Sequence, residues 1–117
     1  MDALKITDIK SAITLFQEAA IKQVESTKYG DYKTGNKYYD LISKVANYLK
    51  EKDAIVKLKP LLYNPSVGVR LWSAYYLLPF YENESIAVLE QIVKESDIHS
   101  LTAETTISEW KKGNLNF

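Results

Sequence analysis

Apolar residues recur along this chain at steps of three and four, which is the spacing that most restricts its fold. Between residues 9 and 24 the apolar positions follow steps of four, three, four and four. This spacing places them on one face of an α-helix. No segment keeps an alternation with period two, so no strand is predicted. The sequence therefore predicts an all-α fold.

The same spacing, read together with helix breakers, predicts about six helices. They begin near Thr7 or Asp8, near Thr34 to Asn36, at Ala54, at Val67, after Asn83 and at Leu101. Asp8 or Thr7, Ser66 and Asn83 are suitable N-caps, while Gly30 and Gly113 are suited to C-terminal positions. Pro60 predicts a kink in the third helix or a true helix start at that residue.

The segment from Val67 to Tyr81 is apolar nearly all round. A helix of this kind packs on several sides, so we expect it at the centre of the molecule. Trp72, Tyr76 and Phe80 share one of its faces.

Length and composition indicate one domain over residues 1–117. A chain of 117 residues with 46% hydrophobic residues can form a single core. It has no cysteine, which excludes disulfides and thiolate metal sites. We find no apolar run long enough to span a bilayer and no signal-peptide pattern, so we expect a cytoplasmic protein that does not enter a membrane.

Charge is distributed unevenly, although the net charge is zero. Residues 1–60 carry eleven lysines against eight acidic residues, whereas residues 82–109 carry seven acidic residues against Lys94 alone. The acidic stretch favours a basic protein partner, or it simply solvates exposed helices. Nucleic-acid binders usually carry a concentrated basic patch, so this class is disfavoured.

Two helix pairs show a weak internal repeat. Leu58, Leu61 and Leu62 match Leu89, Ile92 and Val93 at an offset of 31 residues, and Val69, Ser73 and Leu77 match His99, Ala103 and Ile107 at an offset of 30. Such a period is typical of α-solenoids.

Residues 61–74 resemble a HEAT-type repeat, with two leucines, a short polar turn, Val69-Arg70 and the small pair Ser73-Ala74. His99 departs from this pattern, because it stands where a valine is expected. Nearly the whole chain is similar to a small bacterial family of HEAT-like domains with no assigned activity. The matching features are Phe16, Gly35-Asn36, Arg70-Leu71-Trp72, Ala103-Glu104 and Glu109-Trp110-Lys111-Lys112-Gly113.

This resemblance implies a right-handed α-α superhelix, a HEAT-like solenoid of about three helix pairs. It also implies a binding scaffold. In its most specific form the protein would be an immunity protein that neutralises a toxin domain, such as a nuclease, of a contact-dependent growth inhibition system.

Catalytic chemistry finds little support in the residues. His99 is the only histidine, and no Gly-x-Ser-x-Gly motif or phosphate-binding glycine loop is present. The acidic pairs Glu82/Glu84 and Glu104/Glu109 lack apolar surroundings that would raise a pKa. We therefore expect no enzyme, no cofactor and no metal site.

Two alternative functions stay open. One is a nucleic-acid-binding or base-repair module, in which Trp72 and Trp110 stack on bases and a group of lysines meets phosphates. These lysines are Lys50, Lys52, Lys57 and Lys59. The other is an accessory structural subunit. In either case a monomer is expected.

The nine tyrosines suit protein interfaces because they combine a large contact area with a polar tip, although they also fill seams between helices. Arg70 either contacts the partner or bonds carbonyls at a neighbouring turn. The predicted partner-binding residues are Tyr39, Arg70, Tyr75, Glu82, Glu84, Glu104 and Glu109. The four glutamates would stand in for phosphates in the basic groove of a toxin domain.

Overall fold

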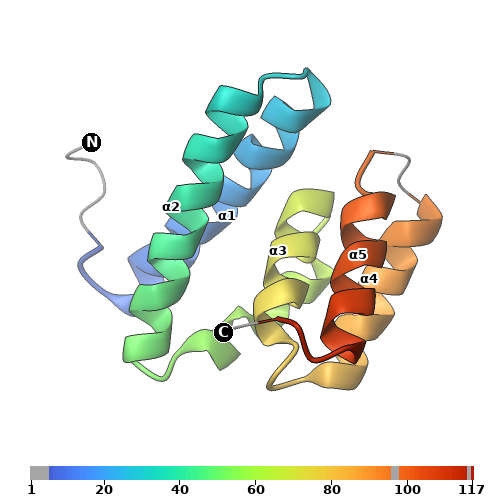
Figure 1. The fold of residues 1–117 in the computed structure, drawn as a ribbon. Coiled ribbons are helices and arrows are strands. Elements are labelled where there is room, and N and C mark those ends of the chain that lie inside the picture. The colour runs from blue at the N-terminus through green and yellow to red at the C-terminus, as the bar shows by residue number, and fades with distance from the viewer. Residues whose placement is uncertain (1–5, 96–97, 116) are drawn as a thin grey trace. The chain divides into compact units, whose positions relative to one another are not determined.

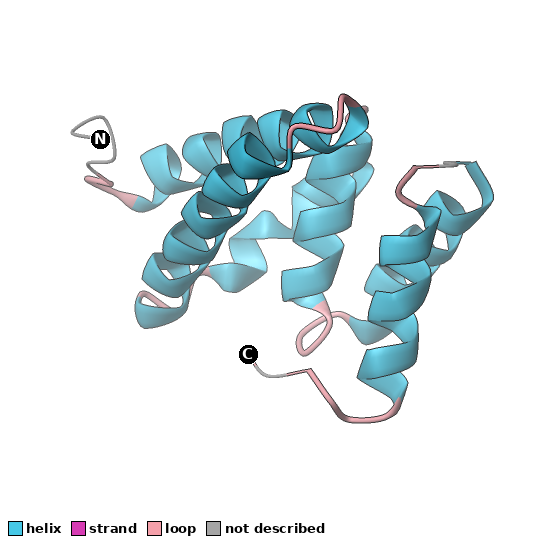
Figure 2. Cartoon of the chain, turned by 45° about the horizontal axis from the view of Figure 1, so that its top comes forward, coloured by secondary structure: helices cyan, strands magenta, loops and turns pink. Residues whose placement is uncertain are grey.

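The computed structural model describes residues 6–95, 98–115 and 117, and all regular structure in these residues is helical (Figures 1 and 2). Five α-helices and one 3-10 helix follow one another. The chain divides into two compact units, an N-terminal unit of residues 1–57 and a C-terminal unit of residues 58–117, with the boundary inside the 3-10 helix at residues 55–63. The predicted all-α class is confirmed. Residues 1–5, which entered the signal-peptide argument, lie outside the described part.

Helix α1 (Ile9–Lys28) begins as the sequence predicts, at Asp8. The Asp8 carboxylate accepts a hydrogen bond from the Ser11 backbone at 2.7 Å, and the Ser11 hydroxyl accepts one from the Asp8 backbone at 3.2 Å. This reciprocal capping satisfies two backbone donors of the first turn. After the helix, Gly30 takes a φ of +74°, which only glycine adopts without strain. The predicted role of Gly30 is therefore confirmed.

Helix α2 (Tyr32–Glu51) begins earlier than predicted, because Asp31 and not a residue near Thr34 caps it. The Asp31 carboxylate accepts a hydrogen bond from the Thr34 backbone at 3.1 Å. Hydrogen bonds from the side chain and the backbone of Thr34 lower the pKa of Asp31. Helices α1 and α2 run side by side in opposite directions (Figure 1). Their facing sides bury the core of the N-terminal unit, which includes Phe16, Ala20, Ile42, Val45 and Leu49.

The third predicted helix is a 3-10 helix, η2 (Ile55–Tyr63), with Pro60 inside it. Both expectations for Pro60 were wrong, since the segment is neither a kinked α-helix nor a helix that starts at proline. The backbone amide that proline lacks is missing from the hydrogen-bond ladder of any helix. Short 3-10 runs are common connectors between longer helices.

Helix α3 (Val67–Leu77) is buried on nearly all sides, as its sequence predicts. Ser66 caps it, through a bond from the Val69 backbone at 3.5 Å. The helix ends four residues earlier than predicted, shortly before Pro79. Phe80 consequently lies beyond the helix and is 53% exposed, which corrects its placement on the buried face.

Helices α4 (Glu82–Glu95) and α5 (Ser100–Lys111) complete the C-terminal unit, in which α3 packs on α4 and α4 on α5. The prediction that Asn83 caps α4 was wrong, because Asn83 lies inside the helix, which begins at Glu82. The Ser85 amide already donates to the Tyr81 carbonyl at 2.9 Å. The three-and-four spacing also predicts that the sixth helix buries Leu101, and this prediction was wrong, since Leu101 is 71% exposed. Gly113 has a φ of +74°, as predicted for the end of α5.

The two copies of the predicted repeat differ in their secondary structure. Its first copy begins with a 3-10 helix, whereas its second begins with a 14-residue α-helix. Val69 lies in the first turn of α3, three residues after its cap, whereas its match His99 is itself the N-cap of α5. The superhelical arrangement therefore stays a prediction.

Candidate protein-binding groove

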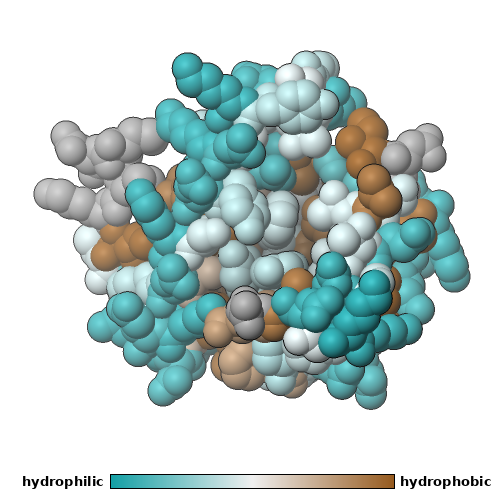
Figure 3. Space-filling model, in the orientation of Figure 1, coloured by the Kyte–Doolittle hydropathy of each residue, from teal (hydrophilic) through white to brown (hydrophobic). Residues whose placement is uncertain are grey.

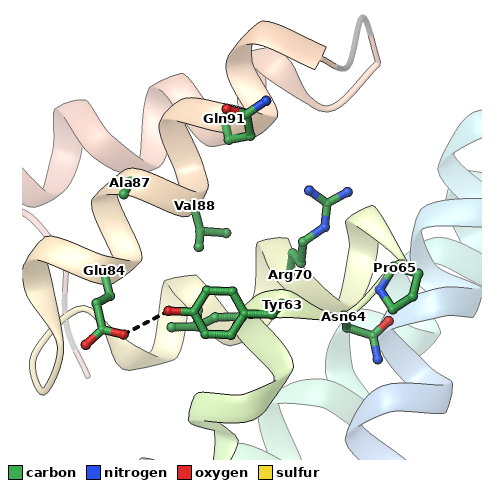
Figure 4. Close-up of a pocket in the computed structure, with 9 residues that line it drawn as sticks. Tyr63, Asn64, Pro65, Arg70, Glu84, Ala87, Val88 and Gln91 are labelled. Atoms are coloured by element: carbon green, nitrogen blue, oxygen red, sulfur yellow. Dashed lines mark hydrogen bonds between the residues drawn. The ribbon is translucent and has the colours of Figure 1, made fainter.

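An open groove of about 550 Å³ lies in the C-terminal unit, between the turn that precedes α3 and one face of α4. Figure 4 shows the side chains around it. Its apolar lining consists of Leu62, Pro65, Ala87 and Val88. Its polar lining consists of Tyr63, Asn64, Arg70, Glu84 and Gln91, so it contains two of the predicted partner-binding residues.

Tyr63 lines the groove and is 67% exposed. Its hydroxyl donates a hydrogen bond to Glu84 Oε2 at 2.9 Å (Figure 4). Lys59 Nζ lies 3.4 Å from the other carboxylate oxygen, Glu84 Oε1. The bond to the carboxylate raises the pKa of Tyr63, because it favours the protonated phenol. Lys59 also lies 4.4 Å from the centre of the Tyr81 ring. These contacts fix the orientation of Glu84.

Arg70 from α3 also lines the groove. Its Nη1 donates to Glu95 Oε1 at 2.6 Å, and Gln91 donates to Glu95 Oε2 at 3.2 Å. Both bonds lower the pKa of Glu95, with the arginine bond as the larger cause. One expectation was that Arg70 donates to the carbonyls of a neighbouring turn. Instead, it forms an ion pair with the carboxylate of Glu95. The Arg70 Nε is buried and has no hydrogen-bond partner in the described residues, so it is an unsatisfied donor inside the protein.

Two ion pairs therefore bracket an apolar middle. Glu84, Val88, Gln91 and Glu95 follow one another on α4 at steps of four, three and four, which places them in one row. Lys59–Glu84 and Arg70–Glu95 each join this row to residues from the preceding elements. Between them lie the apolar side chains of the groove. The groove is therefore an apolar site that is bordered by polar side chains.

The four predicted glutamates do not form one array. Glu82 accepts a hydrogen bond from Trp110 Nε1 at 2.8 Å, and Glu109 accepts one from Asn114 at 2.9 Å. Glu104 lines a separate open hollow of about 570 Å³ between α4 and α5. Of the four, only Glu84 borders the groove.

The two predicted tyrosines lie in different settings. Tyr75 belongs to an aromatic cluster in the C-terminal unit, with its ring centre 5.9 Å from Trp72, 4.9 Å from Tyr76 and 5.3 Å from Phe117. It is half-buried, so much of its ring faces the protein itself. Tyr39 lies on α2 in the N-terminal unit and is 39% exposed.

The tryptophans are poorly placed for stacking on bases. Trp72 is buried. Trp110 is half-buried, and its ring centre lies 5.9 Å from that of Phe117. These contacts weaken the nucleic-acid reading of the sequence.

No cluster of metal-ligating side chains occurs in the residues that the structure describes. His99 is buried, and burial lowers its pKa below the ordinary value of 6.5. Among the helices described, none combines the length and apolar character needed to cross a membrane.

Sequence reasoning missed Tyr63 and Gln91 as groove residues, and it missed Lys59 and Glu95 as the ion-pair partners of Glu84 and Arg70. The spacing of the row from Glu84 to Glu95 is visible in the sequence. The partners of Glu84 and Glu95 come from distant parts of the same chain, so they depend on tertiary packing and no local pattern predicts them.

Comparison with known proteins identifies no relative: no family model, curated protein or solved structure matches this chain.

Proposed function

We propose that this chain is a non-catalytic module that binds a protein partner through the groove between the Tyr63–Pro65 turn and α4. The observation that carries the proposal is an open, partly apolar groove with Tyr63 and Arg70 in its lining. Tyrosine and arginine are enriched among the residues that dominate interface energies. An apolar side chain of the partner would contact the apolar lining formed by Leu62, Pro65, Ala87 and Val88.

Lys59 and Arg70 pair with Glu84 and Glu95 at the groove, so it is the acidic excess of the surrounding sequence that supports a basic partner. The stretch 82–109 carries seven acidic residues against one lysine, and Glu84, Glu90 and Glu95 lie on α4. Complementary charge speeds the encounter of two proteins, while a well-packed anchor slows their separation. A segment that presents an apolar residue flanked by lysine or arginine meets both requirements.

The finer form of the proposal is an immunity protein with a HEAT-like superhelix, acting in the cytoplasm on a toxin domain. It rests on the resemblance of residues 61–74 to a HEAT-type repeat. Within this form, Glu104 is the better phosphate substitute, because Glu82, Glu84 and Glu109 accept hydrogen bonds from Trp110, Tyr63 and Asn114.

Capture of partners with the tagged full chain tests the proposal, using two variants that each add one positive charge to α4. Val88→Lys places its charge in the groove, whereas Asn83→Lys places it at an exposed site that does not line the groove. We expect a stoichiometric protein that Asn83→Lys retains and Val88→Lys loses. A toxin domain silenced on binding would support the immunity form. A partner held equally by both variants, or recovery of nucleic acid alone, would contradict the groove as the binding site.

A further inference from the structure

Helix α2 carries a second surface, in the N-terminal unit, that the proposed function does not use. Tyr32, Asn36, Tyr39, Ser43 and Asn47 follow one another at steps of four, three, four and four, so they lie in one row on the helix. All five are exposed or half-buried, and Tyr32 is 70% exposed. We call this row the tyrosine row. It contains no charged residue, although α2 as a whole is rich in lysine.

A charged row runs beside it on the same helix. Lys33, Lys37, Asp40 and Lys44 repeat the steps of four, three and four, and all are exposed. The three lysines form no ion pair within the described chain. Together with neighbouring residues they line an open hollow of about 670 Å³. We call Lys33, Lys37 and Lys44 the lysine row.

From these two rows we infer that α2 is a docking surface for an acidic segment of a second protein partner. Tyrosine, asparagine and serine are the residues that antibody combining sites use, because tyrosine offers rigid contact area and the small polar residues adapt their hydrogen bonds. The lysine row supplies charge that the chain itself does not neutralise. An acidic partner would place carboxylates on these lysines and an apolar or aromatic residue against Tyr32 and Tyr39.

The composition of the surface favours protein over nucleic acid. Binding along a phosphate backbone uses many basic contacts, whereas the charged row holds three lysines and is interrupted by Asp40. Three of the five residues in the tyrosine row are asparagine or serine, whose amide and hydroxyl groups suit peptide groups. The inference does not depend on the groove in the C-terminal unit, so either one can fail alone.

Selection from a phage-displayed library of random dodecapeptides against the full chain tests the inference. The selected peptides are then measured by calorimetry against four variants. These are Tyr32→Ala/Tyr39→Ala, Lys33→Glu/Lys37→Glu, the charge-matched control Lys10→Glu/Lys22→Glu on α1, and the groove variant Val88→Lys. Circular dichroism and thermal unfolding of each variant confirm that it folds.

We expect acidic peptides with at least one aromatic or apolar residue. Both α2 variants should weaken their binding about tenfold or more, while the α1 control and Val88→Lys leave it within about twofold. Recovery of no peptide, of peptides without an acidic consensus, or of peptides that bind Lys33→Glu/Lys37→Glu unchanged would overturn the inference. Tighter binding of a single-stranded oligonucleotide at this surface than of any peptide would overturn it in favour of nucleic acid.

Discussion

The ion pair between Arg70 and Glu95 shows how a single contact can hold a groove residue in place and make the stability of the fold depend on pH. Arg70 is mostly buried, whereas Glu95 is more exposed. Because the pair lowers the pKa of Glu95 below its ordinary value of 4.5, the folded state holds the ionised carboxylate more strongly than the unfolded chain does. This stability is present above the ordinary pKa and is lost as the pH falls through the lowered value.

We therefore expect Glu95→Gln to lower the free energy of unfolding at pH 7 and to have progressively less effect in acid. Urea unfolding of wild type and variant at pH 7 and pH 3 measures this difference. In an Arg70→Met background, most of the pH-dependent difference should disappear, because the arginine bond is the main cause of the shift. A difference that stays constant with pH would show that the pair does not shape the titration.

Asp31 acts at the same scale on the start of α2. Its carboxylate caps the helix through Thr34, and its pKa is lowered from 3.8 by these bonds. Asp31→Ala should lower the melting temperature at pH 7, while Asp31→Asn, which keeps an acceptor, should lower it less. The advantage of wild type over Asp31→Ala should shrink as the pH falls through the lowered pKa. An equal loss in Asn and Ala variants would indicate a role for charge alone.

At the scale of the elements, spacing predicted the helices well and their ends less well. The cores of α1, α2 and α3 follow from the three-and-four pattern. The start of α2 was missed because Asp31 competes with later residues for the role of cap, and local sequence does not decide between neighbouring caps. The 3-10 form of η2 was missed because a short apolar segment with proline suits several geometries. Sequence proposed Arg70 and Glu84 for the site, but their partners Lys59 and Glu95 required tertiary packing.

Two leucines in neighbouring helices give a direct check on this element scale. Leu89 of α4 is fully buried, whereas Leu101 of α5 is 71% exposed. The reason is rotation, since Leu101 stands two residues, about 200°, from the buried Ala103. Leu89→Ala should cost about 2–5 kcal/mol of unfolding free energy. Leu101→Ala should change it by less than about 0.5 kcal/mol. Denaturant unfolding compares them, and a similar loss in both would contradict the placement of α5.

At the scale of the whole molecule, each unit has exposed hydrophobic residues, such as Tyr32 in the N-terminal unit and Leu101 in the C-terminal unit. In Figure 3 brown apolar residues occupy several separate areas of the visible face, among teal hydrophilic ones. Opposite charge is segregated along the chain, with lysines gathered in its first half and acids in its second. The two proposed surfaces follow this segregation, since the lysine row belongs to the N-terminal unit and the groove to the C-terminal unit. Such a chain has the chemistry to hold two partners of opposite charge.

Whether the two units unfold together decides between the predicted single domain and two cooperative units. The main helix packing lies within units, as α1 with α2, α3 with α4 and α4 with α5. If each unit opens by itself, removing a core side chain from one should loosen that unit alone. Phe16 is fully buried in α1, and its replacement by alanine should cost about 3–5 kcal/mol.

Hydrogen exchange measured by mass spectrometry resolves the two cases. For two units, Phe16→Ala should accelerate exchange throughout α1 and α2 and leave α3, α4 and α5 unchanged, while Leu89→Ala should give the reverse pattern. Equal acceleration of all five helices by either variant would establish one cooperative domain. In that case a partner that stabilises the groove would also protect α1 and α2 from exchange, because binding to a cooperative fold stabilises every part of it.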